Sequence, residues 1–440
     1  MMQQQTDFQE IEIPQAKVAK KGFWQSVVKQ FKKNKLAVFS FWLILFLATI
    51  ATFADFIANE KPLVASYNGT IYFPVFKSYA VDFGASDWPE ELQNVEWNNL
   101  NYKWSVFPPI PYLPKNIDFA NAQSISPFAE QRVKSMRWRH WLGTDELGRD
   151  VMAGMIHGTR IALLVGLISM SIASFIGILL GSLAGYFGDD KLKISRGRIL
   201  LNSLFLLIAI FYAFGSRSYI LQDAINSSFA IFLFEFAVSF LIFLAIMGIA
   251  NFLASVLKKI PFFAVKVNVA VDIIISRLIE VMVSIPTLFL IISIIAIAKP
   301  SIFIVMAIIG LTSWTGIARF IRAELLRVRG LEYIEAAQAL GYSEIRTIFK
   351  HAIPNALSPV LIAIAFGIAT AILIESTLSF LGIGVPAETM TWGSLLSSAR
   401  QSTSAWWLAI FPGLAIFVTV TIYNLVGEGL TDALDPRQKK

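Results

Sequence analysis

The sequence predicts an all-α polytopic membrane protein, and three observations lead to this fold class. The 440 residues are 56% hydrophobic and only 15% charged, whereas a soluble domain contains about 25% charged residues. Eight apolar runs follow one another along the chain, and the short segments between them are alternately rich and poor in Lys and Arg. The same composition excludes disordered and collagen-like chains. The chain has no Cys, which excludes disulfides, thiolate nucleophiles and Cys-ligated metals.

The apolar runs set the expected membrane spans. A hydrocarbon core is crossed by about 20 apolar residues, with a range of roughly 17–25, and most runs reach this length although the third is short. The first run ends without a small-residue cleavage site, so we expect an uncleaved span and not a signal peptide. The expected spans are residues 36–57, 160–187, 199–214, 229–252, 272–298, 301–318, 357–381 and 408–426.

Lys and Arg predict which side of the membrane each short segment faces. Twenty-three of them lie before the first span and in every second loop, while the alternate short connections hold one each, at Arg217, Lys299 and Arg400. Short cytoplasmic loops accumulate Lys and Arg, so we expect residues 1–35 and 431–440 to be cytoplasmic. The formal net charge of +7 is therefore a topology signal. We expect no nucleic-acid binding, because no basic stripe interleaves with aromatic residues on a soluble module.

Residues 58–159 form the longest polar segment between two expected spans. The segment is rich in Trp and Pro, a composition typical of a small irregular cap, which we expect on the extracytoplasmic side. Its aromatic side chains either bind a ligand or pack the cap and rest on the membrane surface. Asp145 and Arg149 are expected to form an ion pair just before the second span.

Glu235 and Glu375 are carboxylates inside the expected spans 229–252 and 357–381. An acid inside a membrane is costly and is a candidate functional residue by default, while a hydrogen bond between helices is the competing explanation. We favour that explanation for Glu235. In the second span, Gly177 and Gly181 form a small-xxx-small spacing that lets two helices approach closely.

The segment 319–356 is too charged to lie in lipid and too regular to be a loop. A first short helix is expected to bury one face, formed by Leu331, Ile334, Ala337 and Leu340. A second helix is expected to bury a stripe formed by Ile345, Ile348, Phe349 and Ile353. Gly341 would end the first helix in the left-handed conformation, Ser343 would cap the second, and Pro354 would end it.

The segment contains a run of residues with a distinctive spacing. This run, E-A-A-x3-G-x9-H-x2-P, is formed by Glu335, Ala336, Ala337, Gly341, His351 and Pro354. It resembles the "EAA" loop of permease subunits of bacterial ABC importers, which is the coupling helix that docks into a cleft on the ATPase subunit. The resemblance implies a coupling role for Glu332, Glu335, Ala336, Ala337, Gly341, His351 and Pro354. His351 is expected to fix the loop through hydrogen bonds.

Other segments resemble one branch of the same family. The run His140–Val151, read as HWLGTDELGRDV, is similar to the segment before the second span in dipeptide and oligopeptide C-type permeases, and residues 375–384 and 432–437 also match. Residues 58–64 are most similar to the Yej-type members, associated with peptides and microcin C. The resemblance implies a MetI-like helical core within residues 160–430 and transport of peptides or peptide-like solutes. Another small solute such as a nickel complex is the alternative, and a secondary transporter or channel is a further one.

The block 191–270 departs from this family. Its members run directly from a Gly-Tyr-Phe-Gly turn to a V-D-x4-R segment, whereas here the block separates Gly188 from Val271. The block contains two of the apolar runs, so the usual six spans would become eight. Two added spans keep every later loop on its side of the membrane, and a re-entrant pair would do the same.

The resemblance also implies the partners of the chain. These are ABC ATPase subunits that use ATP, a second and homologous permease subunit, an extracytoplasmic solute-binding protein and the lipid bilayer of the bacterial cytoplasmic membrane. The sequence has no G-x-x-x-x-G-K-[ST], so we expect a transport subunit and not an enzyme. We expect no cofactor and no metal, because the three His residues are far apart. Glu280 stands where the family usually has Asp, and with Glu375 it is a candidate for the translocation pathway or for helix packing.

Overall fold

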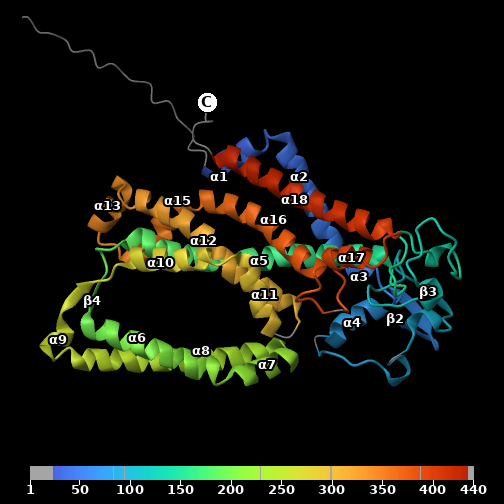
Figure 1. The fold of residues 1–440 in the computed structure, drawn as a ribbon, viewed down its shortest axis with the longest axis horizontal. Coiled ribbons are helices and arrows are strands. Elements are labelled where there is room, and N and C mark those ends of the chain that lie inside the picture. The colour runs from blue at the N-terminus through green and yellow to red at the C-terminus, as the bar shows by residue number, and fades with distance from the viewer. Residues whose placement is uncertain are drawn as a thin grey trace, which may run out of the picture. The chain divides into compact units, whose positions relative to one another are not determined.

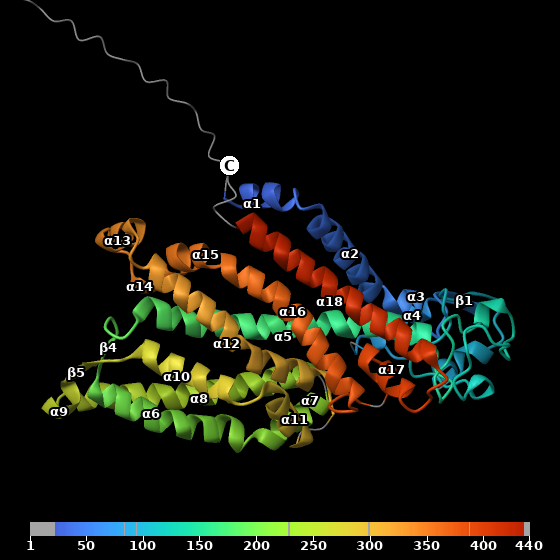
Figure 2. The same cartoon turned by 45° about the horizontal axis from the view of Figure 1, so that its top comes forward.

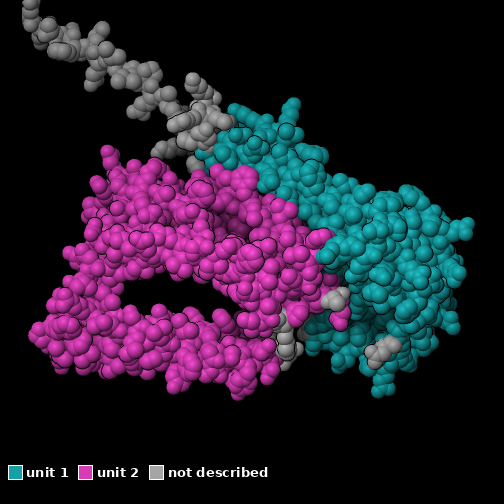
Figure 3. Space-filling model, viewed as in Figure 1, with its two compact units in different colours: residues 1–161, 390–440 teal, residues 162–389 magenta. Residues whose placement is uncertain are grey.

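The computed structural model describes residues 23–434 except 83, 94, 228, 298–299 and 387. Most of the expected cytoplasmic N-terminal segment, Lys299 and the last six residues of the tail therefore lie outside the described residues. The chain forms two compact units, residues 1–161 with 390–440 and residues 162–389 (Figure 3). Each unit is described by itself.

Helices dominate both units (Figure 1). The helices of the first unit are α1 (Phe23–Phe31), α2 (Lys35–Thr52), α3 (Ala54–Ile57), α4 (Pro74–Asp82), α17 (Trp392–Ala399) and α18 (Trp406–Leu434), with the first turns of α5 (Val151–Phe187). Its strands are β1 (Val64–Tyr67), β2 (Thr70–Tyr72) and β3 (Trp104–Val106), and its 3₁₀ turns are Glu90–Leu92, Trp97–Asn99, Phe119–Asn121 and Met136–Trp138.

The second unit continues α5 and holds most of the remaining elements. Its other helices are α6 (Arg196–Ile210), α7 (Ser218–Ser227), α8 (Phe229–Leu257), α9 (Pro261–Ala264), α10 (Val271–Ser284), α11 (Thr287–Ile297), α12 (Ile302–Val328), α13 (Glu332–Ala339), α14 (Glu344–Thr347), α15 (Ile353–Ala356) and α16 (Ser358–Phe380). Two π-helical turns, Phe211–Gly215 and Ile348–Ala352, and two strands, β4 (Lys193–Ser195) and β5 (Lys266–Asn268), complete it.

Seven helices of the described chain are long and apolar enough to cross a membrane, or eight crossings if the bent pair α10–α11 is one span. This confirms the predicted class of a polytopic helical membrane protein. The expected span at 272–298 corresponds to this bent pair, in which α10 and α11 meet at 81°. Pro286 explains the bend, since a proline disfavours helical backbone in the residue before it. Ile285 accordingly has extended angles, φ −92° and ψ 123°.

The helix of the expected second span, α5, begins at Val151, before the expected start of that span at residue 160. Asp150 caps it by accepting a hydrogen bond from the Ala153 amide at 2.6 Å. Polar residues in its early turns find partners in the same unit: Arg160 pairs with Asp55 at 2.7 Å. The polar segment therefore ends at residue 150. In the same way α12 runs past residue 318 to Val328, so the charged segment begins on a helix.

The polar segment of the first unit is the irregular cap that its composition predicts. Its sheet has the order β2-β1-β3, with both pairs antiparallel. Asp145 and Arg149 form the predicted ion pair, with Oδ2 and Nε 2.7 Å apart. Beyond the cap, α18 packs along α2 and α17, and a Cβ on Gly429 would lie 2.3 Å from the Ala37 methyl, so these helices are in close contact.

The core of the second unit lies between α5, α12, α15 and α16. A Cβ on Gly181 would lie 2.5 Å from the carbonyl oxygen of Ala318, so only glycine permits this approach of α5 to α12. Gly177 meets Ile317 in the same way. The predicted small-xxx-small contact is therefore confirmed, and Ser169 adds a hydrogen bond to the Met306 carbonyl at 2.8 Å.

The block 191–270 forms a helical hairpin, in which α6 runs beside α8 in both views (Figures 1 and 2). Within the hairpin α8 also contacts α7 and α9. Arg217, in the turn before α7, pairs with Glu235 on α8 at 2.5 Å, which favours the structural explanation for Glu235. The chain enters and leaves through the antiparallel strands β4 and β5. Next to them the Asp272 amide donates to the Gly188 carbonyl at 3.3 Å. The two ends of the hairpin are thus neighbours, as an insertion requires.

Candidate coupling site

The first helix of the charged segment ends at a glycine. Gly341 has φ +78°, a conformation that costs a residue with a Cβ roughly 1–2 kcal/mol. The amides of Gly341 and Tyr342 donate to the carbonyls of Gln338 (2.9 Å) and Ala337 (3.2 Å). This pair of bonds is the Schellman arrangement, and the predicted left-handed stop is confirmed.

The second helix begins at the predicted cap but does not end where we expected. The Ser343 hydroxyl accepts a hydrogen bond from the Arg346 amide at 3.4 Å. After α14 the chain makes the π-helical turn 348–352 and continues through α15 into α16. Pro354 does not stop it, because it lies in the first turn of α15, where a helix needs no amide hydrogen. The segment is therefore joined to α16 by almost continuous helix.

Burial sorts the apolar residues of the segment into two faces. The buried ones are Ile334, Ala337, Ile348 and Ile353. Leu340, Ile345 and Phe349 are 75%, 69% and 63% exposed, and we call these three the apolar face. The predicted buried stripes are wrong for all three. Leu340 lies beyond the last turn of α13, and the π turn breaks the 3.6-residue period that the stripe assumed.

The residues singled out by the motif lie at different depths. Those exposed are Glu332, Glu335, Ala336, Gly341 and Pro354. Ala337 is buried, so it packs the helix and is not on the surface. Glu335 lines a pocket of about 420 Å³ together with Asp189, Lys191 and Arg329. The pocket brings the end of α5 and the start of α13 to one surface of the second unit.

Tyr186, near the end of α5, holds the segment from behind. It is fully buried, and its hydroxyl donates to the Glu344 carboxylate and accepts from Gln338 Nε2 at 3.0 Å. One hydroxyl therefore ties α13 and α14 to α5. Sequence reasoning missed this residue, although it stands in the Tyr-Phe-Gly turn that marks the start of the inserted block.

A second tie joins α12 to α10. The Arg322 guanidinium donates to both carboxylate oxygens of Asp272, with Nη2 2.7 Å from Oδ2. Such a two-point pair fixes the orientation of both side chains. Asp189 also accepts from the Ile273 amide at 3.2 Å, so the first turn of α10 is held from the end of α5 as well. The charged segment, which begins on α12, is therefore connected to α10 and so to the bent pair that α10 forms with α11.

His351 makes a different contact from the hydrogen bond that we expected of its side chain. Its ring stacks on Tyr342, with centroids 5.7 Å apart and 20° between the planes. Its buried Nε2 has no hydrogen-bond partner in the described part of the chain. His351 therefore fixes the segment by stacking, and its backbone carbonyl accepts from the Asn355 amide group at 2.7 Å.

Glu375 and Glu280, the two candidates for the translocation pathway or for helix packing, lie in opposite environments. Glu375 is 1% exposed and accepts from the Ser379 hydroxyl at 2.5 Å on its own helix α16. Glu280 on α10 is 61% exposed and pairs with Arg277 at 2.6 Å. Glu375 is thus part of the packed interior, while Glu280 lies on the open surface of α10.

Comparison with known proteins gives the same family from both ends of the chain. Residues 260–440 match the family "Binding-protein-dependent transport system inner membrane component", and residues 22–74 match "N-terminal TM domain of oligopeptide transport permease C". The chain is 29% identical over 414 residues to the inner membrane ABC transporter permease protein YejE of Escherichia coli K12, covering 93% of this chain and 96% of the relative.

Two shorter relatives match as well. The chain is 30% identical over 302 residues to the di/tripeptide transport system permease protein DppC of Pseudomonas aeruginosa, covering 68% of this chain and 73% of the relative. It is 28% identical over 326 residues to the dipeptide transport system permease protein DppC of Alkalihalophilus pseudofirmus, covering 73% and 81%. The chain therefore belongs to the family of multi-pass inner membrane permease components of binding-protein-dependent ABC import systems, which work with ATPase and substrate-binding partners.

Proposed function

We propose that this chain is the permease through which an ABC importer moves peptides or peptide-like solutes. The observation that carries the transport role is the segment 329–357, which we call the coupling segment. It presents the exposed apolar face on one side, and on the other side it is bonded to α5 and continues into α16. The peptide class is supported by the printed names of the DppC relatives and by the oligopeptide permease match at the N-terminal end.

The energy for transport comes from separate subunits. An ATPase docks on the apolar face, uses ATP, and moves the segment as it opens and closes. Two rigid routes carry that movement inward: the helix from α14 to α16, and the Tyr186 hydroxyl that binds Gln338 and Glu344. A coupled transition requires an element whose two positions are biased from both sites, and this segment has the required connections. The chain itself holds no cofactor in this scheme.

The segment and both termini face the cytoplasm, and the cap faces outside. The Lys and Arg distribution supports this orientation. Because the chain has no Cys, single cysteines report the side of each loop. Gln222→Cys in α7 is expected to react with an impermeant reagent added outside, and Leu340→Cys only after the membrane is opened. Outside labelling of Leu340→Cys would overturn this orientation.

A second permease subunit, homologous to this one, completes the pathway. The open surface of α10 supports such pairing, because Ile273, Ile274, Val281 and Val283 are all exposed beside Glu280. A solute-binding protein outside the membrane delivers the peptide to the pair.

One experiment tests the coupling role and the solute together. Uptake of a labelled tripeptide is measured in cells that carry the wild-type chain or Gly341→Asp, and the ATPase is captured on each chain. Gly341→Asp puts a Cβ at φ +78° and a charge beside the apolar face. We expect it to abolish uptake and to lose the ATPase while remaining in the membrane. Normal uptake by this variant would contradict the docking role, and uptake of nickel complexes but of no peptide would contradict the solute class.

A further inference from the structure

The cap contains a pocket that neither the family nor the coupling segment explains. It has a volume of about 520 Å³, within the range of roughly 300–1,000 Å³ typical of small-molecule sites. All of its lining residues belong to the cap, between Glu60 and Trp138. Its walls combine aromatic rings, carboxylates, side-chain amides and two cations, which is the chemistry of a site for a ligand with charges of both signs.

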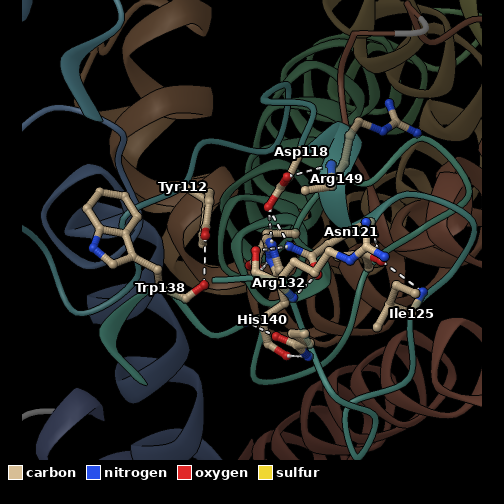
Figure 4. Close-up of polar contacts among 12 residues, drawn as sticks. Tyr112, Asp118, Asn121, Ile125, Arg132, Trp138, His140 and Arg149 are labelled. Atoms are coloured by element: carbon tan, nitrogen blue, oxygen red, sulfur yellow. Dashed lines mark hydrogen bonds and ion pairs between the residues drawn. The ribbon is translucent and has the colours of Figure 1, made fainter. Parts of the chain in front are cut away.

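The apolar wall of the pocket is rigid. Trp97 and Tyr112 are buried, and Trp138 is half-buried. The Tyr112 hydroxyl donates to the Trp138 carbonyl at 2.7 Å, as Figure 4 shows, and their rings meet edge to face at 6.0 Å. Flat rings held in place can cover apolar parts of a ligand without selecting one side chain.

The polar wall has acceptors that lack a donor. Glu60 accepts a hydrogen bond from Asn116 Nδ2. Asn116 Oδ1 and Asn98 Oδ1 are both buried, and neither has a donor in the described part of the chain. Burying an unpaired acceptor is unfavourable. Asn98 and Asn116 line the pocket together with Glu60 and Glu96, so this wall is rich in acceptor groups, which suits the N–H groups of an ammonium or a peptide amide.

A buried anchor keeps a third carboxylate of the pocket in place. His140 lies between two acids, with Nδ1 2.8 Å from Asp150 and Nε2 3.2 Å from Asp118. The Tyr112 ring stacks on the imidazole with centroids 4.4 Å apart. Asp118, which lines the pocket, is therefore compensated by His140. Glu60 accepts a hydrogen bond from Asn116 and lies near the charge of Lys61, and Glu96 accepts a hydrogen bond from Asn99.

The cations of the pocket are Arg132 and Lys134, both exposed. Lys134 Nζ donates to Asn99 Oδ1 at 2.8 Å and to the Asn98 carbonyl at 3.4 Å, so it is positioned and has one of its three donors left. An exposed pair of donors of this kind fits a carboxylate group. The pocket thus offers carboxylates and amide oxygens to an ammonium, and two cations to a carboxylate.

We propose that the cap pocket binds a short peptide by both of its charged ends. The α-ammonium lies against Glu60 and Asn116, the terminal carboxylate against Arg132 and Lys134, and the side chains against Trp97 and Trp138. This inference rests on the proposed function, since it assigns to the permease itself a site for the peptide that the importer moves. In this proposal the cap itself binds and selects the peptide.

The test measures peptide binding to the assembled permease–ATPase complex in nanodiscs, without the solute-binding protein. The probes are tri-alanine, N-acetyl-tri-alanine and tri-alanine amide, with binding followed by calorimetry. Tri-alanine is expected to bind, and blocking either end is expected to weaken binding about tenfold or more, since charged hydrogen bonds are lost. Glu60→Gln and Lys134→Gln are expected to weaken it to the same extent.

Matched controls separate the pocket from the rest of the cap. Glu90→Gln and Lys103→Gln make the same changes at cap residues outside the pocket, and should bind tri-alanine like the wild type. Equal binding of the blocked and free peptides, or of the Glu60→Gln and wild-type chains, would overturn the proposal. Binding-protein-dependent peptide uptake in the wild type tests the proposed function separately: uptake with no binding to the cap rejects the pocket alone.

Discussion

The inserted hairpin and the coupling segment are both excursions from the helical core of the second unit, and they are attached in opposite ways. The hairpin enters and leaves through two short paired strands, and only 6% of the most apolar stretch of α8 is buried, against 50% in α12. The coupling segment buries Ile334 and Ile348 in the core and is bonded to Tyr186. The two excursions therefore differ in how they are connected to the core, and not only in size and hydrophobicity.

The largest expected effect comes from the apolar face of the coupling segment. Leu340→Asp should lower the affinity for the ATPase about thirtyfold, as expected for a hot-spot contact of about 2 kcal/mol. Capture of the ATPase on the purified chain measures this. Leu147→Asp, the same change at an exposed leucine of the cap, is the control. Equal capture by both variants would place the ATPase elsewhere.

The next effect tests the tie behind that face. Tyr186→Phe removes the hydroxyl that binds Gln338 and Glu344. Because Gln338 is half-buried and Glu344 is exposed, water can replace the lost bonds, and we expect a loss of roughly 0.5–1.5 kcal/mol. The ATPase should still dock and hydrolyse ATP, but peptide uptake per ATP should fall severalfold. Tyr212→Phe, at an exposed tyrosine next to the start of the hairpin's π turn, should change nothing. If the ratio of uptake to hydrolysis is unchanged in Tyr186→Phe, this route does not carry the movement.

A third kind of attachment holds the cap together, namely the buried His140 between Asp118 and Asp150. Its contribution to the stability of the cap should depend on pH. Burial disfavours a charged His140, but the hydrogen bonds and charges of Asp150 and Asp118 outweigh burial and raise its pKa above 6.5. The stabilisation is therefore fully present below pH 6.5 and is lost as the pH rises through the raised pKa. For Asp118, burial raises the pKa, but hydrogen bonds from Asn121 and His140 outweigh it and bring the pKa below 3.8.

The contribution of Asp118 is accordingly present above pH 3.8 and is lost as the pH falls through the lowered pKa. The cap should be most stable in the mildly acidic range and should lose stability at alkaline pH. Thermal unfolding followed by tryptophan fluorescence at several pH values measures this. His140→Gln should flatten the alkaline side of the profile, and an unchanged profile in that variant would assign the pH dependence to other groups.

The smallest effect is expected from removing the hairpin. Deleting residues 191–269 would join two ends that are already neighbours, since the Asp272 amide bonds to the Gly188 carbonyl beside the hairpin. The deleted chain should insert, capture the ATPase and move peptide much as the full chain does. Loss of uptake with the ATPase still bound would show that the hairpin, despite its few connections to the core, has a role in transport.

The features that sequence predicted well are those with a local cause. Apolar runs become helices because lipid offers no partner to a backbone amide, and Gly341 ends a helix because of its own backbone. The bend at Pro286 had a visible signal that the length of the apolar run concealed. The exposure of Leu340 and Phe349 and the contacts of Tyr186 had none, since they depend on which elements the fold brings together and on a π turn that shifts the helical period.

The π turn at residues 348–352 fixes an angle as well as a connection. Each residue of an α-helix advances the direction of its side chain by about 100°, so an insertion or deletion between Phe349 and α16 would rotate the apolar face about the helix axis. The segment would keep its composition and its helices while pointing its docking residues away from their partner. The number of residues between Phe349 and α16 therefore sets the direction in which the apolar face points. Substitutions in this stretch should be tolerated, whereas the insertion or deletion of one residue should not.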